Sequence, residues 1–557
     1  MGNNDNPSTF LERTIMKKKT RFLALCLTLS LAMPAISAIN VKTVEVKAES
    51  EYDQSDGFGY EVKNDGTVVI REYNGYSGYV EIPSTINGMT VSEIGREAFS
   101  RYLDDGTNEP ITDIIIPYGV KIIGDGAFKN TPTIQRISIP ESVTMIGSAV
   151  FDGCVGLQSI EIPSTIKSLG SGTFYGCYNL TNVVLPNGFT EIGDEMFSGC
   201  TSLSSITIPA TVTKIGSSAF QNCTALSNIT IPDSVTEIGE YAFSDCPGLK
   251  NVKLSGTIKE IGEGAFSNSG ITSITIPKNL SKISNSLFYD CEQLKTVTIE
   301  SGVKEIGASA FKGCISLNNV TMPNTVTTIG ARAFSECRSM NKVKLPSSVT
   351  KVGKAAYEYC SGVKSIILSA KMTEIPDELF ADCTSLKSVV IPKKVTKIGE
   401  DAFYNCSSLT YVAIPLSVLY YGSEAFDECP KLKDLYYVGT AKQFNTNMAK
   451  AASKRSDEDT IELLKKLNKH YQATGPTKST LTLTNSKLTM TKGSSKKLTY
   501  KLAGNKLCLN VTFTSSNKKV CTVGLTTGTI KAKASGTAVI TVKTDSGLVK
   551  KCTVTVK

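Results

Sequence analysis

The sequence predicts a mainly β protein, a solenoid of about fifteen 23-residue units followed by a small antiparallel β-sandwich. Two observations carry this prediction. An Ile-Gly doublet or a variant of it recurs fifteen times over residues 94–422, nearly always at a step of 23 residues. Over residues 479–557, short runs of alternating apolar and polar residues are separated by Gly, Asn and Ser. That alternation is typical of antiparallel strands.

Residues 1–38 are interpreted as an N-terminal extension followed by a secretory signal peptide. Four basic residues follow Met16 and precede the apolar run 22–33, after which small residues occur. This is the pattern of an export signal. We expect the chain to start at Met16 and to be cleaved after Ala38 or, as the alternative, after Ala48. The apolar run is too short for a stable membrane span, so we expect no transmembrane anchor.

Each repeat follows the pattern L-x-x-I-x-I-P-x-x-V-x-x-I-G-x-x-A-F-x-x-C. The alternation of Ile206 and Ile208 predicts a short strand with one buried face, which Pro209 ends because proline cannot donate a ladder hydrogen bond. Gly216 is expected to permit a tight backbone corner. A Phe stands five positions after each Ile of the doublet, with Tyr357 as the one aromatic replacement. One unit cannot bury its own apolar face, so the units must stack.

This pattern resembles the BspA-like class of bacterial leucine-rich repeats, over about residues 79–440. Residues 66–95 are similar to the N-terminal capping unit of that class, so residues 39–78 are expected to hold an N-terminal segment and the start of the cap. Residues 432–444 resemble its final unit. The resemblance implies a curved solenoid with a parallel sheet on its concave side. It also implies adhesion or recognition without catalysis.

A cysteine stands eight residues after the Ile of the doublet in twelve of the fifteen units, whereas Tyr102, Thr131 and Ser269 take that position in the others. We interpret these cysteines as a structural ladder of small buried side chains. Occasional disulfides are an alternative, although equivalent side chains in stacked units point the same way. A metal site is a further alternative, but zinc ligands usually cluster at short spacing such as C-x-x-C. The ladder comprises Cys154, Cys177, Cys200, Cys223, Cys246, Cys291, Cys314, Cys337, Cys360, Cys383, Cys406 and Cys429.

The composition argues against an enzyme. The chain has no Trp and a single histidine, His470, whereas acid–base chemistry near neutral pH usually uses a placed imidazole or paired carboxylates. The sequence has no G-x-S-x-G, H-E-x-x-H or P-loop motif. We therefore expect no catalytic residues, no cofactor and no bound metal.

The variable positions of L-x-x-I-x-I alternate with the buried ones and should face outward. Early and middle units carry polar residues there, whereas later units carry Lys, Tyr, Ile and Val. Such a patch predicts an interaction surface; the alternative is plain β-propensity. The candidate binding face comprises Lys342, Lys344, Lys364, Ile367, Lys387, Val390, Tyr411 and Tyr436.

Residues 441–478 are charged and are predicted to form a helical linker, with a modest apolar face on Ile461, Leu463, Leu464 and Leu467. Residues 479–557 are predicted to form the sandwich. Segment 511–542 resembles the group 2 bacterial immunoglobulin-like domain, with Phe513 in place of the usual Trp. This resemblance implies a spacer or a binding module. Its three cysteines, Cys508, Cys521 and Cys552, allow at most one pair.

The C-terminal segment 478–557 is strongly basic, with fifteen lysines and one acidic residue, Asp545. A cationic module suits an anionic partner such as a cell-wall polymer; the alternative is that the lysines serve solubility and protect exposed strand edges. A nucleic-acid partner is not expected, because the chain is exported and lacks an aromatic stacking platform.

These features together predict a secreted or cell-surface bacterial protein that binds host or neighbouring-cell macromolecules, protein or glycan, through the solenoid. The alternative function is a glycan-binding or cell-wall-associated structural protein.

Overall fold

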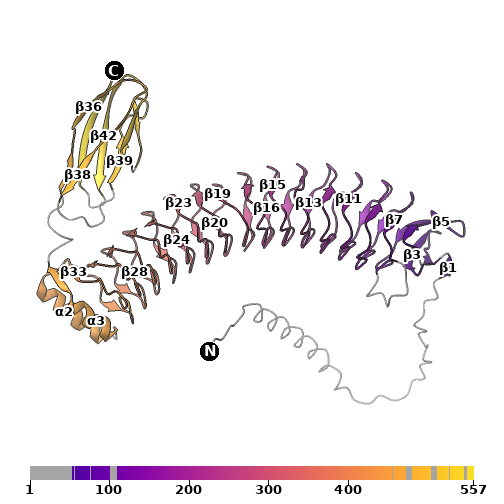
Figure 1. The fold of residues 1–557 in the computed structure, drawn as a ribbon, viewed down its shortest axis with the longest axis horizontal. Coiled ribbons are helices and arrows are strands. Elements are labelled where there is room, and N and C mark those ends of the chain that lie inside the picture. The colour runs from indigo at the N-terminus through magenta and orange to yellow at the C-terminus, as the bar shows by residue number, and fades with distance from the viewer. Residues whose placement is uncertain are drawn as a thin grey trace, which may run out of the picture. The chain divides into compact units, whose positions relative to one another are not determined.

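The computed structural model describes residues 53–55, 57–75, 77–100, 110–454, 456–471, 480–503, 511–525, 527–544 and 548–557. The expected signal segment, Tyr102 and Cys508 lie outside these residues. The described chain is mainly β, with a solenoid of about 16 turns of about 23 residues each, followed by small β-sheets (Figure 1). The predicted fold class is therefore confirmed.

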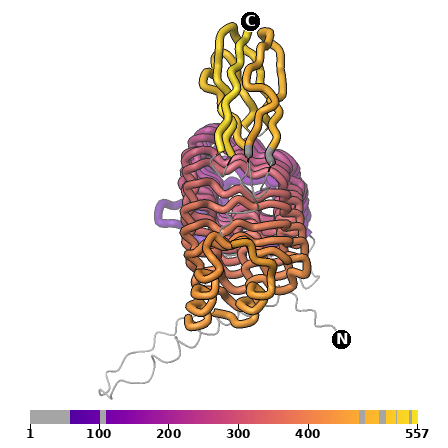
Figure 2. The backbone as a smooth tube through the Cα atoms, turned by 90° about the vertical axis from the view of Figure 1, so that its left-hand side faces the viewer, coloured from indigo at the N-terminus to yellow at the C-terminus, as the bar shows by residue number. Residues whose placement is uncertain are grey.

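One side of nearly every turn carries the L-x-x-I-x-I strand, and we call the stack of these strands the long-strand face. The turn with Ile206 and Ile208 is an exception, because residues 203–209 form no strand and Ile206 is only partly buried, so the strand predicted there was wrong. The strands pair in parallel and in register, as Ile229 beside Val252 illustrates, and Figure 2 shows the successive turns as parallel rungs. The middle residue is buried in most of these strands, and its two neighbours are at least partly exposed in most of them, as the alternation predicts. They are β4 (Tyr79–Glu81), β7 (Asp113–Ile115), β9 (Arg136–Ser138), β11 (Ser159–Glu161), β12 (Asn182–Val184), β15 (Asn228–Thr230), β17 (Asn251–Lys253), β19 (Ser273–Ile276), β21 (Thr296–Ile299), β23 (Asn319–Thr321), β25 (Lys342–Lys344), β27 (Ser365–Ile367), β29 (Ser388–Val390), β31 (Tyr411–Ile414) and β33 (Asp434–Tyr437).

A second side carries two-residue strands that end at the Ile of the doublet. Pro209 lies between the two sides, although no strand precedes it, and its carbonyl oxygen accepts a hydrogen bond from the Val212 N–H at 3.1 Å. These short strands also pair in parallel with their neighbours. They are β8 (Ile122–Ile123), β10 (Met145–Ile146), β13 (Glu191–Ile192), β14 (Lys214–Ile215), β16 (Glu237–Ile238), β18 (Glu260–Ile261), β20 (Lys282–Ile283), β22 (Glu305–Ile306), β24 (Thr328–Ile329), β26 (Lys351–Val352), β28 (Glu374–Ile375), β30 (Lys397–Ile398) and β32 (Tyr420–Tyr421).

The glycine of the doublet is required by the close approach of the preceding unit. A Cβ atom on Gly239 would lie 2.4 Å from the main-chain nitrogen of Ser217, and one on Gly353 would lie 2.3 Å from that of Ala331. Neither glycine has a positive φ. The expected corner at this position therefore depends on the missing side chain and not on a left-handed backbone.

The short-strand sheet is interrupted at three places, and two of them coincide with replacement of the doublet glycine. At the third, between β10 and β13, the turn of Leu169 and Gly170 forms no short strand although the glycine is present. One sheet ends at β18 and the next begins at β20, which is followed by Ser284; that sheet ends at β26, and the last begins at β28, which is followed by Pro376. Ser284 has a Cβ atom, which would lie too close to the preceding unit at equivalent positions such as Gly239 and Gly353. Pro376 has no N–H to donate to the preceding unit. Two of the three interruptions therefore coincide with single-residue changes.

The third side of each turn carries the A-F-x-x-C sequence, whose aromatic rings form one continuous stack. From Phe128 to Phe426, neighbouring ring centroids are 5.2–5.9 Å apart and the ring planes differ by 3–15°. These values match favourable offset stacking. Tyr357 occupies one rung of the stack, between Phe334 and Phe380.

Each ladder cysteine donates a hydrogen bond from its thiol to a main-chain carbonyl oxygen of the preceding unit. Cys223 Sγ lies 3.1 Å from the Phe197 carbonyl oxygen, and the other eleven make the equivalent contact at 3.0–3.3 Å. Thr131, one of the three exceptions, donates its hydroxyl to the Phe99 carbonyl oxygen at 3.0 Å. The position thus favours a small side chain that carries a donor. All fourteen cysteines that the structure describes are free thiols.

An antiparallel cap covers the N-terminal end. Strand β1 (Asp53–Ser55) pairs with β2 (Phe58–Val62), and β2 pairs with β3 (Val68–Tyr73). Strand β3 then pairs in parallel with β6 (Met89–Ile94), which also forms a hairpin with β5 (Thr85–Ile86).

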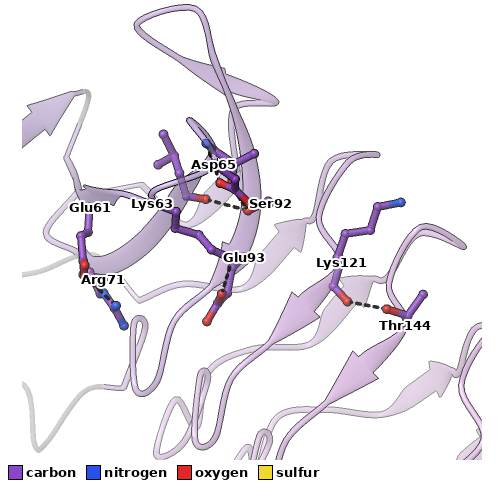
Figure 3. A network of polar contacts seen from close by, with 10 residues as sticks. Glu61, Lys63, Asp65, Arg71, Ser92, Glu93, Lys121 and Thr144 are labelled. Carbon is purple, nitrogen blue, oxygen red and sulfur yellow. Dashed lines mark hydrogen bonds and ion pairs between the residues drawn. The ribbon is translucent and has the colours of Figure 1, made fainter.

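Ion pairs link the cap strands. Figure 3 shows Lys63 beside Glu93, 3.1 Å between charged atoms, and Arg71 beside Glu61, at 2.6 Å. The core of the solenoid begins within this cap, at Phe58.

A helical cap covers the other end of the solenoid. The first part of the predicted helical linker is helical but packs against the solenoid as this cap. Helices α2 (Ala441–Ser453) and α3 (Glu458–Lys466) bury their apolar residues in the same core as the solenoid, and β34 (Asn468–Tyr471) pairs in parallel with β33. The expected apolar face on Ile461, Leu464 and Leu467 is buried there, whereas Leu463 is partly buried. No helix in the described part of the chain is long and apolar enough to cross a lipid bilayer.

The C-terminal segment has its own hydrophobic core, around Phe513, Ile540 and Val554. Its pairing is largely antiparallel, as predicted, but β36 runs parallel to β43. Cys521 and Cys552 are both buried in this core as free thiols. The strands are β35 (Thr480–Leu483), β36 (Lys487–Met490), β37 (Ser495–Lys497), β38 (Tyr500–Ala503), β39 (Val511–Ser515), β40 (Cys521–Val523), β41 (Thr529–Ala532), β42 (Gly536–Thr544) and β43 (Val549–Val556).

Candidate binding face

The eight residues of the candidate binding face lie on consecutive turns of the long-strand face. Three come from the pair β25–β27, where Lys344 stands beside Ile367. Three come from the neighbouring sheet of β29, β31, β33 and β34, and Lys364 and Lys387 directly precede β27 and β29. Figure 1 shows these turns at the C-terminal end of the solenoid, towards β33. The solenoid therefore brings the predicted residues together on one side.

Three members of the candidate face, Val390, Tyr411 and Tyr436, belong to an apolar cluster that is separate from the core, whereas Ile367 does not. Val390, Tyr411, Ala413 and Tyr436 pack against one another on the outward side of β29, β31 and β33. Register explains this contact, because Val390, Ala413 and Tyr436 are direct neighbours across the three strands. The Tyr411 and Tyr436 rings meet edge to face, with centroids 5.5 Å apart.

Tyr436 is less accessible than an outward position of a strand suggests, because the end cap covers it. Its side chain is 8% exposed. The His470 ring stacks on it at 4.5 Å, and His470 Nε2 lies 3.0 Å from Asp434 Oδ1. Burial, and to a lesser degree the Asp434 carboxylate, raises the pKa of the Tyr436 hydroxyl. Tyr436 thus supports the cluster, and Tyr411 and His470 present more of their rings to solvent.

The lysines come from the turns of β25, β27 and β29, on one side of this cluster. Lys342, Lys344, Lys364 and Lys387 are exposed, whereas Ile367 and Val390 are partly buried. An apolar patch with polar, charged residues at its edge is an arrangement that protein interfaces share. It has no counterpart in the early turns, where residues such as Asn228 and Thr230 occupy the outward positions.

Sequence reasoning did not assign His470 to this face. The residue follows two helices and reaches the sheet only because β34 adds the last strand beside β33. The apolar spacing of Ile461, Leu464 and Leu467 is the signal that could have indicated packing of the helices against the solenoid.

The family described as BspA type leucine rich repeat region matches this chain over residues 92–227, 213–341 and 304–433, which together make up more than half of it. Among solved structures, a leucine-rich repeat protein from Bacteroides ovatus is 28% identical, with a TM-score of 0.54, and the match covers 69% of this chain and 99% of that protein. A leucine rich cell surface protein from Faecalibacterium prausnitzii is 27% identical over 71% of this chain and 96% of its own, with a TM-score of 0.39.

A leucine-rich repeat protein from Eubacterium ventriosum is 21% identical over 57% of this chain and 95% of its own, with a TM-score of 0.37. No match was found among curated proteins. The repeat phase, the stacked core and the family match agree: the chain belongs to the BspA type leucine-rich repeat proteins.

Proposed function

We propose that this protein is a secreted or cell-surface binding protein, without catalytic activity, that holds a host or neighbouring-cell macromolecule on the long-strand face between β25 and β34. The observation that carries the proposal is the second apolar cluster, of Val390, Tyr411, Ala413 and Tyr436, which lies outside the core. Ala413 and Tyr436 are buried within this cluster, so its partly exposed members, Val390 and Tyr411, provide the apolar contact area for a partner. The export signal in the sequence supports the location.

The chemistry of the face indicates a partner that is anionic around an apolar or stacking centre. Tyr411 supplies an amphipathic ring at low entropic cost, and the four exposed lysines supply positive charge around it. Lysines on a rim act mainly on the association rate and its salt dependence. An acidic protein surface and an acidic glycan both fit this description.

Binding of the full chain to a host-protein panel and to a glycan array tests the proposal. Tyr411→Ser combined with Lys364→Glu and Lys387→Glu should weaken the strongest interaction by at least tenfold, while the thermal unfolding profile stays unchanged. Lys253→Glu is the matched control, because Lys253 occupies an outward, exposed position of β17. Equal affinity of the triple variant and the wild type would refute this face.

A glycan-binding or wall-associated role is the second candidate, and the C-terminal segment favours it. We infer that this segment is an immunoglobulin-like module. Its sequence resemblance and its own hydrophobic core, which is separate from that of the solenoid, support this inference. All thirteen lysines whose side chains are described there are exposed: Lys487, Lys492, Lys496, Lys497, Lys501, Lys518, Lys519, Lys531, Lys533, Lys543, Lys550, Lys551 and Lys557. The sequence of this segment holds a single acidic residue, Asp545, and such an excess of cations suits a polyanion.

Salt-dependent sedimentation with purified cell walls tests this role. The full chain should bind at low salt and be released near physiological ionic strength or above it, where charges are screened beyond about 8 Å. Replacing Lys531, Lys533, Lys550 and Lys551 by Gln should lower the salt concentration of release. No binding at low salt would reject the role and leave the first proposal standing.

A further inference from the structure

The long-strand face is open between β23 and β25. These strands belong to separate sheets, since β23 ends the sheet of β19 and β21 whereas β25 pairs only with β27. In the turn of β23, Val320 and Met322 are partly exposed, although the equivalent residues of most turns are buried. A cavity of about 230 Å³ lies between the two turns. It is far larger than one water molecule requires.

Tyr357 lines this cavity from inside the core. Its ring is stacked between Phe334 and Phe380, with centroids 5.2 and 5.5 Å away, so both ring faces are covered and only the ring edge with the hydroxyl is left to face the cavity. The side chain is 1% exposed and its hydroxyl makes no hydrogen bond with the protein. A buried hydroxyl without a partner is costly, so a ligand that bonds to it gains from the contact.

The other lining residues favour a negatively charged ligand. Met340 and Val343 are buried walls, and Met side chains adapt to irregular shapes. The rim consists of three Asn and two Lys, and no acidic residue lines the cavity. The lining residues are Asn318, Asn319, Val320, Met322, Met340, Asn341, Lys342, Val343, Lys344 and Tyr357.

We propose that this cavity binds a small carboxylate-bearing molecule, with the carboxylate at the lysine rim and a hydrogen-bonding group at the Tyr357 hydroxyl. Lysine ammonium groups and Asn amides are donors suited to a carboxylate. The apolar walls enclose the body of the ligand, as in most small-molecule sites. This site shares Lys342 and Lys344 with the proposed macromolecular face. Tyr357 belongs to the core and Tyr411 to the outer surface, so substitution of Tyr357 tests the cavity and substitution of Tyr411 tests the face.

Calorimetric titration of the full chain with two acid–neutral pairs tests the proposal. The probes are D-glucuronate against D-glucose and N-acetyl-L-alanine against N-acetyl-L-alaninamide, so that a sugar acid and an acylated amino acid are distinguished. At least one acid should bind at millimolar concentration or better and at least tenfold more tightly than its neutral counterpart. Failure of both acids to bind, or equal affinity of acid and neutral probe, would overturn the proposal.

Substitution of Tyr357 identifies the site. Tyr357→Phe restores the residue that the other fourteen units carry, so the variant should fold, and it should bind the preferred acid about tenfold more weakly because one hydrogen bond is lost. Tyr421→Phe is the matched control, because Tyr421 is also buried with an unpartnered hydroxyl but does not line the cavity. Unchanged affinity of Tyr357→Phe, or an equal loss in Tyr421→Phe, would contradict the assignment.

Discussion

Cys223 donates its thiol to the main-chain carbonyl oxygen of Phe197, 3.1 Å away in the preceding unit. The same carbonyl oxygen also accepts the main-chain N–H of Cys200. The cysteine ladder is therefore a set of hydrogen bonds between units as well as a set of buried side chains. This explains why Thr131, a hydroxyl donor, replaces cysteine in one turn.

The donor requirement can be tested with two isosteric substitutions of Cys223. Cys223→Thr keeps a donor, whereas Cys223→Val has nearly the same shape without one, so the valine variant should be less stable than the threonine variant by about 1 kcal/mol. Urea unfolding followed by circular dichroism measures the difference. Equal stability of the two variants would show that only size matters at this position.

The buried thiols should make the protein sensitive to alkali. Burial raises the pKa of Cys154 to about 12 and that of Cys291 to about 11, from an ordinary value of 9.0. Above about pH 9 the unfolded chain loses these protons and the folded chain retains them, so the free energy of unfolding should fall by roughly 1 kcal/mol per pH unit for each ladder thiol. Below that pH the contribution is fully present.

Urea unfolding at a series of pH values from neutral to about 10.5 measures this slope. In a variant with Cys154, Cys223 and Cys314 all replaced by Thr, the free energy of unfolding should fall by roughly 3 kcal/mol less per pH unit than in the wild type. As a control, thiol titration in denaturant without reductant should reveal reactive ladder cysteines. Few reactive thiols there would instead support disulfides between units.

Gly239 should not tolerate a methyl group. A Cβ atom at this position would lie 2.4 Å from the Ser217 nitrogen, so Gly239→Ala must push two units apart and should cost about 1–3 kcal/mol. Gly256→Ala is the matched control, because no atom lies within 4 Å of the added Cβ and the backbone φ is not positive. Its effect on thermal stability should be within about 0.5 kcal/mol. Equal effects of the two changes would contradict the close-approach explanation.

The helical cap should stabilise the last turns of the solenoid. Leu464 is fully buried in the shared core, so Leu464→Ala should cost about 2–5 kcal/mol. Hydrogen exchange should show the loss first in β31, β33 and β34, because a solenoid opens locally from its ends. The exposed Lys466 provides the control, and Lys466→Ala should leave exchange unchanged. Uniform faster exchange along all turns would show that the cap does not act locally.

The phase of the repeat was predictable from sequence because each unit meets the same neighbours. Phe220 and Cys223 recur at a fixed step, so burial in one turn implies burial in all. Two breaks in the short-strand sheet coincide with Ser284 and Pro376, which depart from the glycine of the doublet, whereas the break between β10 and β13 occurs where Gly170 is kept. That these two replacements interrupt the sheet depends on the close contact with the preceding unit, which only the structure shows.

Features that depend on non-repeating contacts were not predictable. Tyr436 reads as an outward residue, yet His470, on a strand that follows two helices, covers its ring. Tyr357 reads as a conservative replacement of Phe, and only the parting of β23 from β25 gives its hydroxyl a cavity to face. In both cases the deciding contact comes from a break in the repeat and not from the repeat itself.

The caps also limit how copies of the protein meet. An uncovered terminal turn would offer another molecule the same row of main-chain donors and acceptors that each turn offers its neighbour, and such edges template fibre growth. Here antiparallel strands close one end, and helices with the short, charged strand β34 close the other. The number of stacked turns is therefore fixed by the repeats in the chain, and a higher protein concentration should not extend the stack by adding further copies at its ends.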